Sequence, residues 1–305
     1  AQDCLQRARQ KSQNPVVQYV SELNSVELDI IEDRLNNAKI RIDDFLNWQN
    51  IYSDKVALVY PITFCIRAKI SSIEGDVTSM ISHLSLALAE SSMFPHAFHE
   101  FQIISYALEL MKANSISQKQ REPLFKAMVF MLEAKDWYTG RGHSSAVANF
   151  ATALWDTWQY KSAKPALRED LYWAAYLHDI GKIKLPRSLL NKIAPLSDKE
   201  FKLLRKHPVY SQEILDEFGA HSIAKLAGEH HQDAQGRGYP GNEPASPMGL
   251  CIALADIIEA ATSAGRVYRT PKTLGVVLEE LAEMGPERYP TGLVDAVQVL
   301  CTIKE

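Results

Sequence analysis

Cysteine is scarce in this sequence: the four residues, Cys4, Cys65, Cys251 and Cys301, lie far apart in 305 positions. Scattered cysteines form neither the paired spacing of a structural zinc site nor a convincing disulfide framework. Because nothing in this pattern requires oxidation, we expect the chain to fold in the reducing cytoplasm.

Long apolar runs are missing as well. The longest stretch outside the expected core helices, residues 56–66, is too short to cross a bilayer and contains the helix-disrupting Pro61. The polar opening Ala1-Gln-Asp-Cys-Leu-Gln-Arg7 lacks the apolar core of a signal peptide. We therefore expect no membrane span and no signal peptide.

The sequence has no excess of positive charge. Its 33 Lys and Arg residues and 37 Asp and Glu residues leave a formal net charge of -4, which argues against a general binder of DNA or of anionic membranes. Hydrophobic residues make up 46% and charged residues 23%, which is typical of a globular chain with a sizeable core. An anionic ligand must therefore meet a local basic patch.

The first 115 residues are predicted to form a small mixed α/β domain with a regulatory or sensory role. Short β-rich runs at residues 16–20, 39–42 and 55–60 alternate with helical patterns at 25–36 and 43–52. This order faintly resembles a receiver domain, but the third run ends at Val59-Tyr60-Pro61 without a phosphoacceptor aspartate. We therefore expect no phosphorylation. Two further helices are expected at 76–90 and 97–111.

Residues 116–305 are predicted to form an all-α catalytic domain, so the fold as a whole is mainly α. The polar stretch 114–122 marks the boundary between the two domains. A capping box, Ser197 with Glu200, should begin one of the helices. The expected helices are 124–136, 144–157, 166–177, 199–206, 210–218, 222–231, 249–263 and 274–284. In such bundles, facing helices commonly supply metal ligands.

An apolar helix in this domain ends in the sequence His178-Asp179-Ile-Gly181-Lys182. A carboxylate at the end of a helix rich in Leu, Trp, Ala and Tyr should be largely buried, where a charge needs an ionic partner or a metal. A single salt bridge would explain an isolated His-Asp pair. Further histidines and an aspartate along the chain favour a metal site instead.

Seven side chains are the candidate metal ligands: His143, His178, Asp179, His207, His230, His231 and Asp256. Imidazole and carboxylate groups suit Fe, Mn, Zn, Co or Ni, and no cysteine cluster accompanies them, so a catalytic site is favoured over a structural one. Seven donors exceed what one tetrahedral ion needs. We therefore expect two divalent transition-metal ions, with Asp179 as the bridge and a shared water or hydroxide as the nucleophile.

The ordered motifs resemble the HD-GYP family of cyclic di-GMP phosphodiesterases, which belongs to the HD-domain superfamily of metal-dependent phosphohydrolases. The motifs are His178-Asp179-Ile-Gly-Lys182, His207-Pro208, His230-His231, Gly238-Tyr239-Pro240 and Ala255-Asp256. The match covers roughly residues 124–300. The resemblance implies an all-α HD-type domain behind a variable sensory domain, which hydrolyses cyclic di-GMP to pGpG, and in some members onward to GMP.

The resemblance also implies a role for each matching residue. It places His143, His178, Asp179 and Asp256 at one end of the metal cluster, and Asp179, His207, His230 and His231 at the other. The catalytic residues are then Asp179 and Lys182, and Lys182 contacts the scissile phosphate. Substrate would also meet Tyr239, beside the groove, and the paired arginines Arg266 and Arg269. Lys184, Arg187 and Arg237 could add to the basic patch.

The chain departs from the family pattern at several positions. After His231 it has Gln232-Asp233-Ala234-Gln235-Gly236, where the family has Glu-Arg and a later Asp, so we expect a loss of charge in this loop. Thr139 stands where some members have a glutamate that binds a third ion, so no third ion is expected. Glu259 replaces an aspartate. The remaining histidines, His83, His96, His99 and His221, are expected not to bind metal.

Two alternatives stay open at this point. The first is an HD-GYP protein that does not hydrolyse its ligand and instead binds a cyclic dinucleotide or a diguanylate cyclase domain. The second is an HD hydrolase of another nucleotide, because the fold and the metal site do not fix the substrate. Lys182 and the complete set of ligands favour the enzyme. The sequence gives no oligomeric state.

Overall fold

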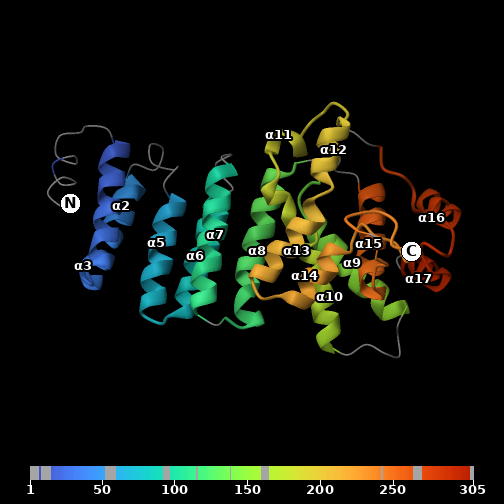
Figure 1. Cartoon of the computed structure of the whole chain (residues 1–305), viewed down its shortest axis with the longest axis horizontal. Helices are drawn as coiled ribbons and strands as arrows, with labels where there is room; N and C mark the ends of the chain where they lie inside the picture. Colours follow the sequence, from blue (N-terminus) through green and yellow to red (C-terminus); the bar gives the residue numbers. More distant parts are fainter. Residues whose placement is uncertain are drawn as a thin grey trace. The chain divides into compact units, whose positions relative to one another are not determined.

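The computed structural model describes residue 7 and residues 15–51, 60–91, 97–114, 116–137, 139–158, 165–241, 243–263 and 270–302. The chain divides into two compact units, Ala1–Met131 and Leu132–Glu305. The division falls inside one helix, α8 (Gln118–Lys135). Helices make up both units (Figure 1), which confirms the prediction of a mainly α fold.

The first unit is helical wherever it is described. Its helices are α2 (Pro15–Ile31), α3 (Leu35–Ile51), α5 (Tyr60–Ile73), α6 (Val77–Ser91), α7 (Ala97–Ala113) and most of α8. A buried apolar cluster joins α2, α3 and α5 through Leu23, Val26, Ala38, Ile42, Phe45, Ile66 and Ile70. The bounds of α6 and α7 match the helices expected at 76–90 and 97–111.

The predicted mixed α/β domain is wrong, because no strand occurs among the described residues of this unit. Residues 16–20 belong to α2 and residues 39–42 to α3. Of the third run, Tyr60 begins α5, and residues 55–59 lie outside the described residues. Ile40 and Ile42 would share one face of a strand. In the structure Ile40 is 61% exposed and Ile42 only 2%, whereas Ala38, Ile42 and Phe45 are buried at helical spacing.

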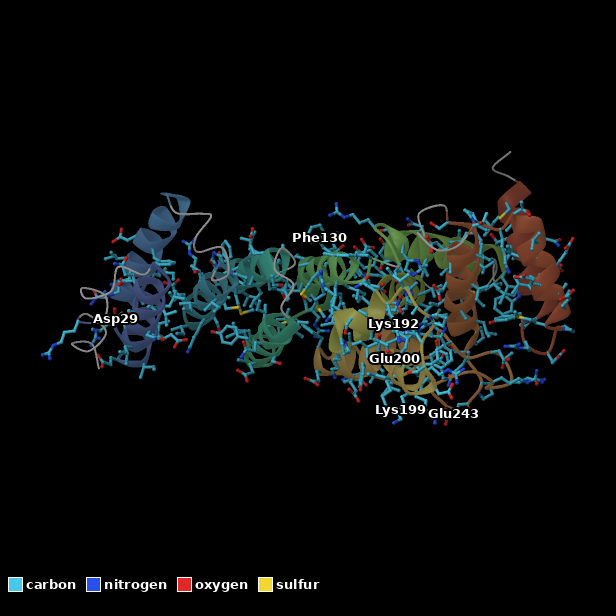
Figure 2. The ribbon with its side chains drawn as sticks, turned by 90° about the horizontal axis from the view of Figure 1, so that it is seen from above. Asp29, Phe130, Lys192, Lys199, Glu200 and Glu243 are labelled. Carbon is cyan, nitrogen blue, oxygen red and sulfur yellow. The ribbon has the colours of Figure 1, made fainter. Side chains whose placement is uncertain are left out.

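One buried charge also ties α2 to α3. Asp29 (labelled in Figure 2) is 1% exposed and is paired with two arginines. The Nε atom of Arg34 lies 2.8 Å from Oδ1, and the Nε atom of Arg41 lies 2.8 Å from Oδ2. A buried carboxylate needs such partners, because its desolvation is otherwise too costly.

The second unit is helical as well, as predicted for the catalytic domain. Its helices are α9 (His143–Trp158), α10 (Pro165–Leu177), the 3₁₀ turn η2 (Ile180–Lys184), α11 (Arg187–Leu190), α12 (Asp198–Leu204), α13 (His207–Glu217), α14 (His221–Gly228), α15 (Pro247–Thr262), α16 (Leu274–Glu283) and α17 (Thr291–Thr302). The capping box of Ser197 and Glu200 begins α12, as expected.

Helix α9 lies at the centre of this unit and packs against α10, α15 and α17. Its buried face carries the small residues Ala148 and Ala151 between Val147 and Leu154, so neighbouring helices approach closely. Helix α13 packs against α14 and against the turn η2. The first residues of α9 and α13 and the turn η2 therefore meet inside one core. No described helix is long and apolar enough to cross a membrane.

Candidate metal centre

The turn after α10 carries the motif His178-Asp179-Ile-Gly181-Lys182 and lies directly against the first turn of α13. A Cβ atom on Gly181 would overlap the carbonyl oxygen of His207 and the amide nitrogen of Ser211, so only glycine permits this approach. The Ser211 hydroxyl fixes the contact. It accepts a hydrogen bond from the Gly181 N–H at 2.8 Å and donates one to the His178 carbonyl at 2.6 Å.

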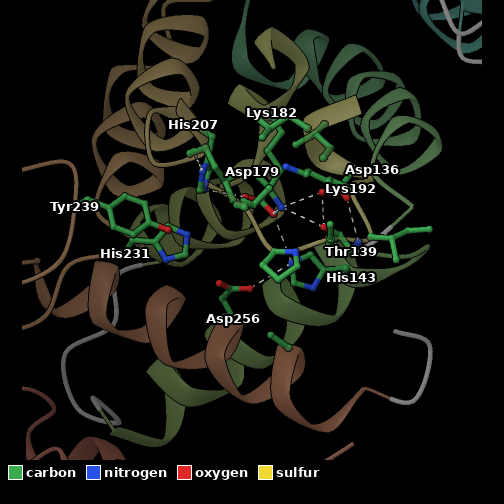
Figure 3. A pocket seen from close by; sticks show the side chains of 18 residues that line it. Asp136, Thr139, His143, Asp179, Lys182, Lys192, His207, His231, Tyr239 and Asp256 are labelled. Carbon is green, nitrogen blue, oxygen red and sulfur yellow. Dashed lines mark hydrogen bonds and ion pairs between the residues drawn. The ribbon is translucent and has the colours of Figure 1, made fainter. Parts of the chain in front are cut away.

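The Asp179 carboxylate lies between His143 and His207 (Figure 3), and each of its oxygens faces one of two groups of histidines. Oδ2 is 3.3 Å from Nε2 of His178 and 3.8 Å from Nε2 of His143. Oδ1 is 3.2 Å from Nε2 of His207 and 3.9 Å from Nε2 of His230. A carboxylate in this position is able to bridge two cations.

Each group supplies three donors besides Asp179. The first donor group is His143, His178 and Asp256, and the second donor group is His207, His230 and His231. Asp256 Oδ1 lies 3.4 Å from Nε2 of His143 and 3.9 Å from Nε2 of His178. The Nε2 atoms of His207 and His230 are 3.1 Å apart. All seven residues singled out from the sequence therefore converge.

Three of the histidines are oriented by the backbone. The Nδ1 atoms of His178, His207 and His230 each donate to the carbonyl three residues earlier, at 2.7, 2.8 and 2.6 Å. Because Nδ1 carries the proton, Nε2 keeps its lone pair toward the site. Burial lowers the pKa of His230 well below its usual value and that of His231 to about 3, so both rings are neutral. The Nε2 lone pairs of these histidines face one another, and this arrangement fits a bound cation.

His143 is oriented differently, by a carboxylate. Its Nδ1 is hydrogen-bonded to Glu259 on α15, three residues after Asp256. Burial opposes protonation of His143, but the bonds to Asp256 and Glu259 outweigh it and raise the pKa to about 9. This end of the site therefore favours positive charge. From the sequence, Glu259 was predicted only to replace the family's aspartate, although its spacing from Asp256 places both residues on one face of α15.

Lys182 is held beside the bridging carboxylate. Its Nζ lies 2.7 Å from Asp179 Oδ2, 3.0 Å from Asp136 Oδ2 and 3.1 Å from Thr139 Oγ1. Burial opposes the charge, but Asp136 and Asp179 raise the pKa of Lys182, so it stays an ammonium. The role of Asp136 was not predicted from the sequence. Thr139 is hydrogen-bonded to Asp136 as well as to Lys182, so its side chain is engaged with these two residues.

The segment after His231 turns back and places Tyr239 beside the second donor group. Gly238 has φ of +109°, and a Cβ atom there would overlap the carbonyl oxygen of His231. The Tyr239 N–H donates to that carbonyl at 3.2 Å. Its ring lies 4.5 Å from the His231 ring, centroid to centroid, and the guanidinium of Arg205 lies 5.2 Å from its centre. Tyr239 thus has a fixed position on the wall of the site (Figure 3).

The loop after His231 is held together by Asp233, whose structural role was not predicted from the sequence. Asp233 is 2% exposed, and its Oδ1 accepts hydrogen bonds from the N–H groups of Gln235 and Arg237, each at 2.9 Å. Arg288 Nε donates to Oδ2 at 2.7 Å. Burial opposes the charge, but these bonds lower the pKa of Asp233. The loop is therefore held by a buried ion pair with a residue 55 positions away.

The donors open into a cavity of about 500 Å³, shown in part in Figure 3. One wall is polar, with Asp179, Lys182, His231 and Tyr239 among its residues. A second wall is largely apolar and is formed by Leu189, Leu190, Ile193, Ala194, Pro195 and Leu196. Such a volume is within the range of small-molecule sites, and the two walls suit a ligand with both charged and aromatic parts.

Few of the expected basic residues line this cavity. Of those that the structure describes, Lys182 does. Lys192, which was not predicted, also lines the cavity and contacts Glu200 at 2.7 Å. The others make contacts elsewhere: Lys184 with Glu213, Arg187 with the Ala134 carbonyl and Arg237 with Gln235. Arg266 and Arg269 lie outside the described residues, so their predicted phosphate contacts remain predictions.

Comparisons with known proteins agree with the motifs. A family model described as HD domain matches residues 103–291. The 3'3'-cGAMP-specific phosphodiesterase 3 of Vibrio cholerae is 33% identical over 50% of this chain and 34% of its own length. The cyclic di-GMP phosphodiesterase of Thermotoga maritima is 33% identical over 42% of this chain and 36% of its own length. The chain thus spans about a third of the length of these curated relatives.

A solved structure also resembles the chain. It is that of Bd1817, an HDG"Y"P protein from Bdellovibrio bacteriovorus, with 13% identity, a TM-score of 0.44, and coverage of 81% of this chain and 72% of that one. The family assignment rests on the sequence match, which covers more than half of the chain. The chain belongs to the HD domain family, and within it to the HD-GYP proteins that its motifs resemble.

Proposed function

We propose that the chain is a metal-dependent phosphodiesterase that hydrolyses a cyclic dinucleotide. The observation that carries this proposal is the position of Asp179 between two groups of histidine and carboxylate donors, with the ammonium of Lys182 2.7 Å away. The relatives named as cyclic di-GMP and 3'3'-cGAMP phosphodiesterases support the class of substrate. We expect cyclic di-GMP or a related cyclic dinucleotide as substrate and pGpG as the product, with onward hydrolysis to GMP left open.

The donors fit two divalent transition-metal ions, foremost Fe or Mn, with Zn, Co or Ni also compatible with imidazole and carboxylate ligands. The first donor group would hold one ion and the second donor group the other, with Asp179 shared between them. When bound, such a pair supplies Lewis-acid stabilisation of phosphoryl oxygens and lowers the pKa of water.

The chain's own residues would bind and orient the substrate. Lys182, charged and held by Asp136 and Asp179, places a positive charge where a phosphate would approach the donors. Tyr239 offers an aromatic face beside the second donor group, on which a base could stack. The apolar wall at Ile193 and Leu196 would exclude water from the side of the ligand that it covers.

The role of residues 1–115, the cellular location and a protein partner are proposals as well. Among the described residues, none that lines the cavity precedes Asp136, so we propose that residues 1–115 regulate the domain at 116–305 instead of contributing to catalysis. A cytoplasmic location is proposed from the scattered cysteines. A diguanylate cyclase domain as partner belongs to the alternative in which the protein binds without hydrolysis.

An assay with several nucleotides tests the function. Purified protein loaded with Mn or Fe is incubated with cyclic di-GMP, 3'3'-cGAMP and linear nucleotides, and the products are separated by chromatography. Hydrolysis of a cyclic dinucleotide supports the proposal. Hydrolysis of linear nucleotides alone would favour another HD hydrolase, and tight binding without any product would favour a binding module. Either of these two results contradicts the proposed activity.

Replacing Lys182 with alanine should slow turnover without emptying the metal centre. The ammonium is not among the metal donors, so metal content should match that of the parent. Turnover should fall by roughly 10²–10³-fold, the usual effect of removing one preorganised charge-stabilising group. Steady-state kinetics and elemental analysis check both parts. The matched control is Lys184→Ala, because Lys184 pairs with Glu213 and does not line the cavity. Full activity in the Lys182 variant would refute its assigned role.

Replacing Tyr239 with alanine should weaken substrate binding and leave metal content unchanged. The ring lies beside His231 but is not among the metal donors, and loss of a base-stacking aromatic costs roughly 1–3 kcal/mol. Calorimetry with cyclic di-GMP measures the affinity. Tyr239→Phe keeps the ring and should bind like the parent. If Tyr239→Ala also binds like the parent, Tyr239 only packs against the histidines.

A further inference from the structure

The two donor groups differ in charge. Besides the shared Asp179, the first donor group contains the carboxylate of Asp256, and Glu259 adds a second negative charge through its bond to His143 Nδ1. The second donor group consists of three histidines, and the Nδ1 atoms of His207 and His230 donate to neutral carbonyls. A divalent cation is therefore attracted more strongly to the first donor group.

The positive charges nearby do not cancel this difference. Lys182 contacts Asp179 Oδ2, the oxygen that faces the first donor group, but Asp136 lies 3.0 Å from the same ammonium and balances its charge. Arg205 lies over the ring of Tyr239, which itself lies beside His231, so its charge is on the side of the second donor group.

We propose that the two donor groups load unequally, the first donor group binding a divalent cation before the second and more tightly, and that Glu259 is the positioning residue that sets this order. Glu259 fixes the ring of His143 so that Nε2 faces the site, and its charge makes that nitrogen a stronger donor. The inference rests on the proposed metal site, and it adds that the two ions are not equivalent.

Manganese titration of the metal-stripped full chain tests the order of loading. Electron paramagnetic resonance measures both the free Mn²⁺ and the coupling between bound ions. We expect two binding steps whose affinities differ by ~10-fold or more, an order-of-magnitude expectation from the outer-shell effect on metal affinity. At one equivalent, the spectrum should be that of isolated ions. A single step with equal affinities, or a coupled pair at one equivalent, would overturn the proposal.

Variants assign the steps to the donor groups. Glu259→Gln keeps an acceptor for His143 Nδ1 but removes the charge, so the first step should weaken by roughly 10–100-fold and the second should not change. His231→Gln should weaken the second step alone. Glu243→Gln, at an exposed position, is the control for the loss of one carboxylate. An unchanged first step in Glu259→Gln refutes the role of Glu259.

Two features keep the test decisive. The two-step binding is measured on the parent protein, so it is informative even if Glu259→Gln does not fold. Thermal unfolding of the metal-free variants shows whether each variant is folded. No cyclic dinucleotide takes part in the titration. Failure of the proposed hydrolysis would therefore leave these results unchanged, and the two proposals are distinguishable.

Discussion

Replacing Asp179 with alanine should remove both metal ions and abolish hydrolysis. The two oxygens of this carboxylate face different donor groups, at 3.3 Å from His178 Nε2 and 3.2 Å from His207 Nε2, so neither group keeps its complete set of donors without it. Elemental analysis should find well under one equivalent of metal. Turnover should fall by at least ~10³-fold, the upper range for loss of a preorganised electrostatic group.

The control for this variant is Asp198→Ala, which removes an exposed carboxylate from the first turn of α12. Surface substitutions of this kind usually change stability by no more than about 0.5 kcal/mol, so metal content and activity should match those of the parent. Asp179→Asn keeps the size of the side chain and separates loss of charge from loss of packing. If Asp179→Ala retains two equivalents of metal, the bridging role is wrong.

Replacing Gly181 with alanine should destabilise the second unit strongly. The added Cβ would overlap the His207 carbonyl oxygen and the Ser211 amide nitrogen, which are backbone atoms that cannot turn away. Overpacking of this kind costs on the order of 3 kcal/mol. Because His207 belongs to the second donor group, the same displacement should lower the metal affinity. Chemical denaturation of the metal-free protein measures the free energy of unfolding.

Gly275 offers the matched control. It is exposed in the first turn of α16, and a Cβ atom there would meet nothing within 4 Å. Gly275→Ala should therefore leave stability unchanged or raise it by up to roughly 1 kcal/mol, because alanine loses less backbone entropy in a helix. Equal free energies of unfolding for the two alanine variants would mean that α13 moves away from η2 at little cost.

The sequence located the candidate ligands because their chemistry appears in short local patterns. His178 and Asp179 are adjacent, as are His230 and His231, and a buried carboxylate at the end of an apolar helix needs compensation wherever that helix packs. Most helices of the second unit were likewise predictable, because apolar positions recur at helical spacing and Ser197 with Glu200 marks a helix start. Helices α11 and α17 were not predicted.

The residues that support the ligands were not predictable in this way. Glu259 bonds to a histidine 116 positions away, Asp136 to a lysine 46 positions away, and Asp233 to an arginine 55 positions away. In the sequence each is one acidic residue among 37. Only the packing of the helices decides which of these acidic residues is buried away from water and gains a specific partner.

In the first unit, a local sequence pattern predicted the wrong secondary structure. Runs such as residues 39–42 contain β-branched residues in alternation, which favours a strand over four positions. The longer pattern of Ala38, Ile42 and Phe45 buries one helical face against α2 and α5, and tertiary packing outweighs the weak local preference. The sequence by itself determined the candidate metal ligands of this protein, since their pattern depends on residue types at short spacing. The tertiary structure alone decided the helical first unit and the partners that orient each ligand, since both depend on contacts between distant segments.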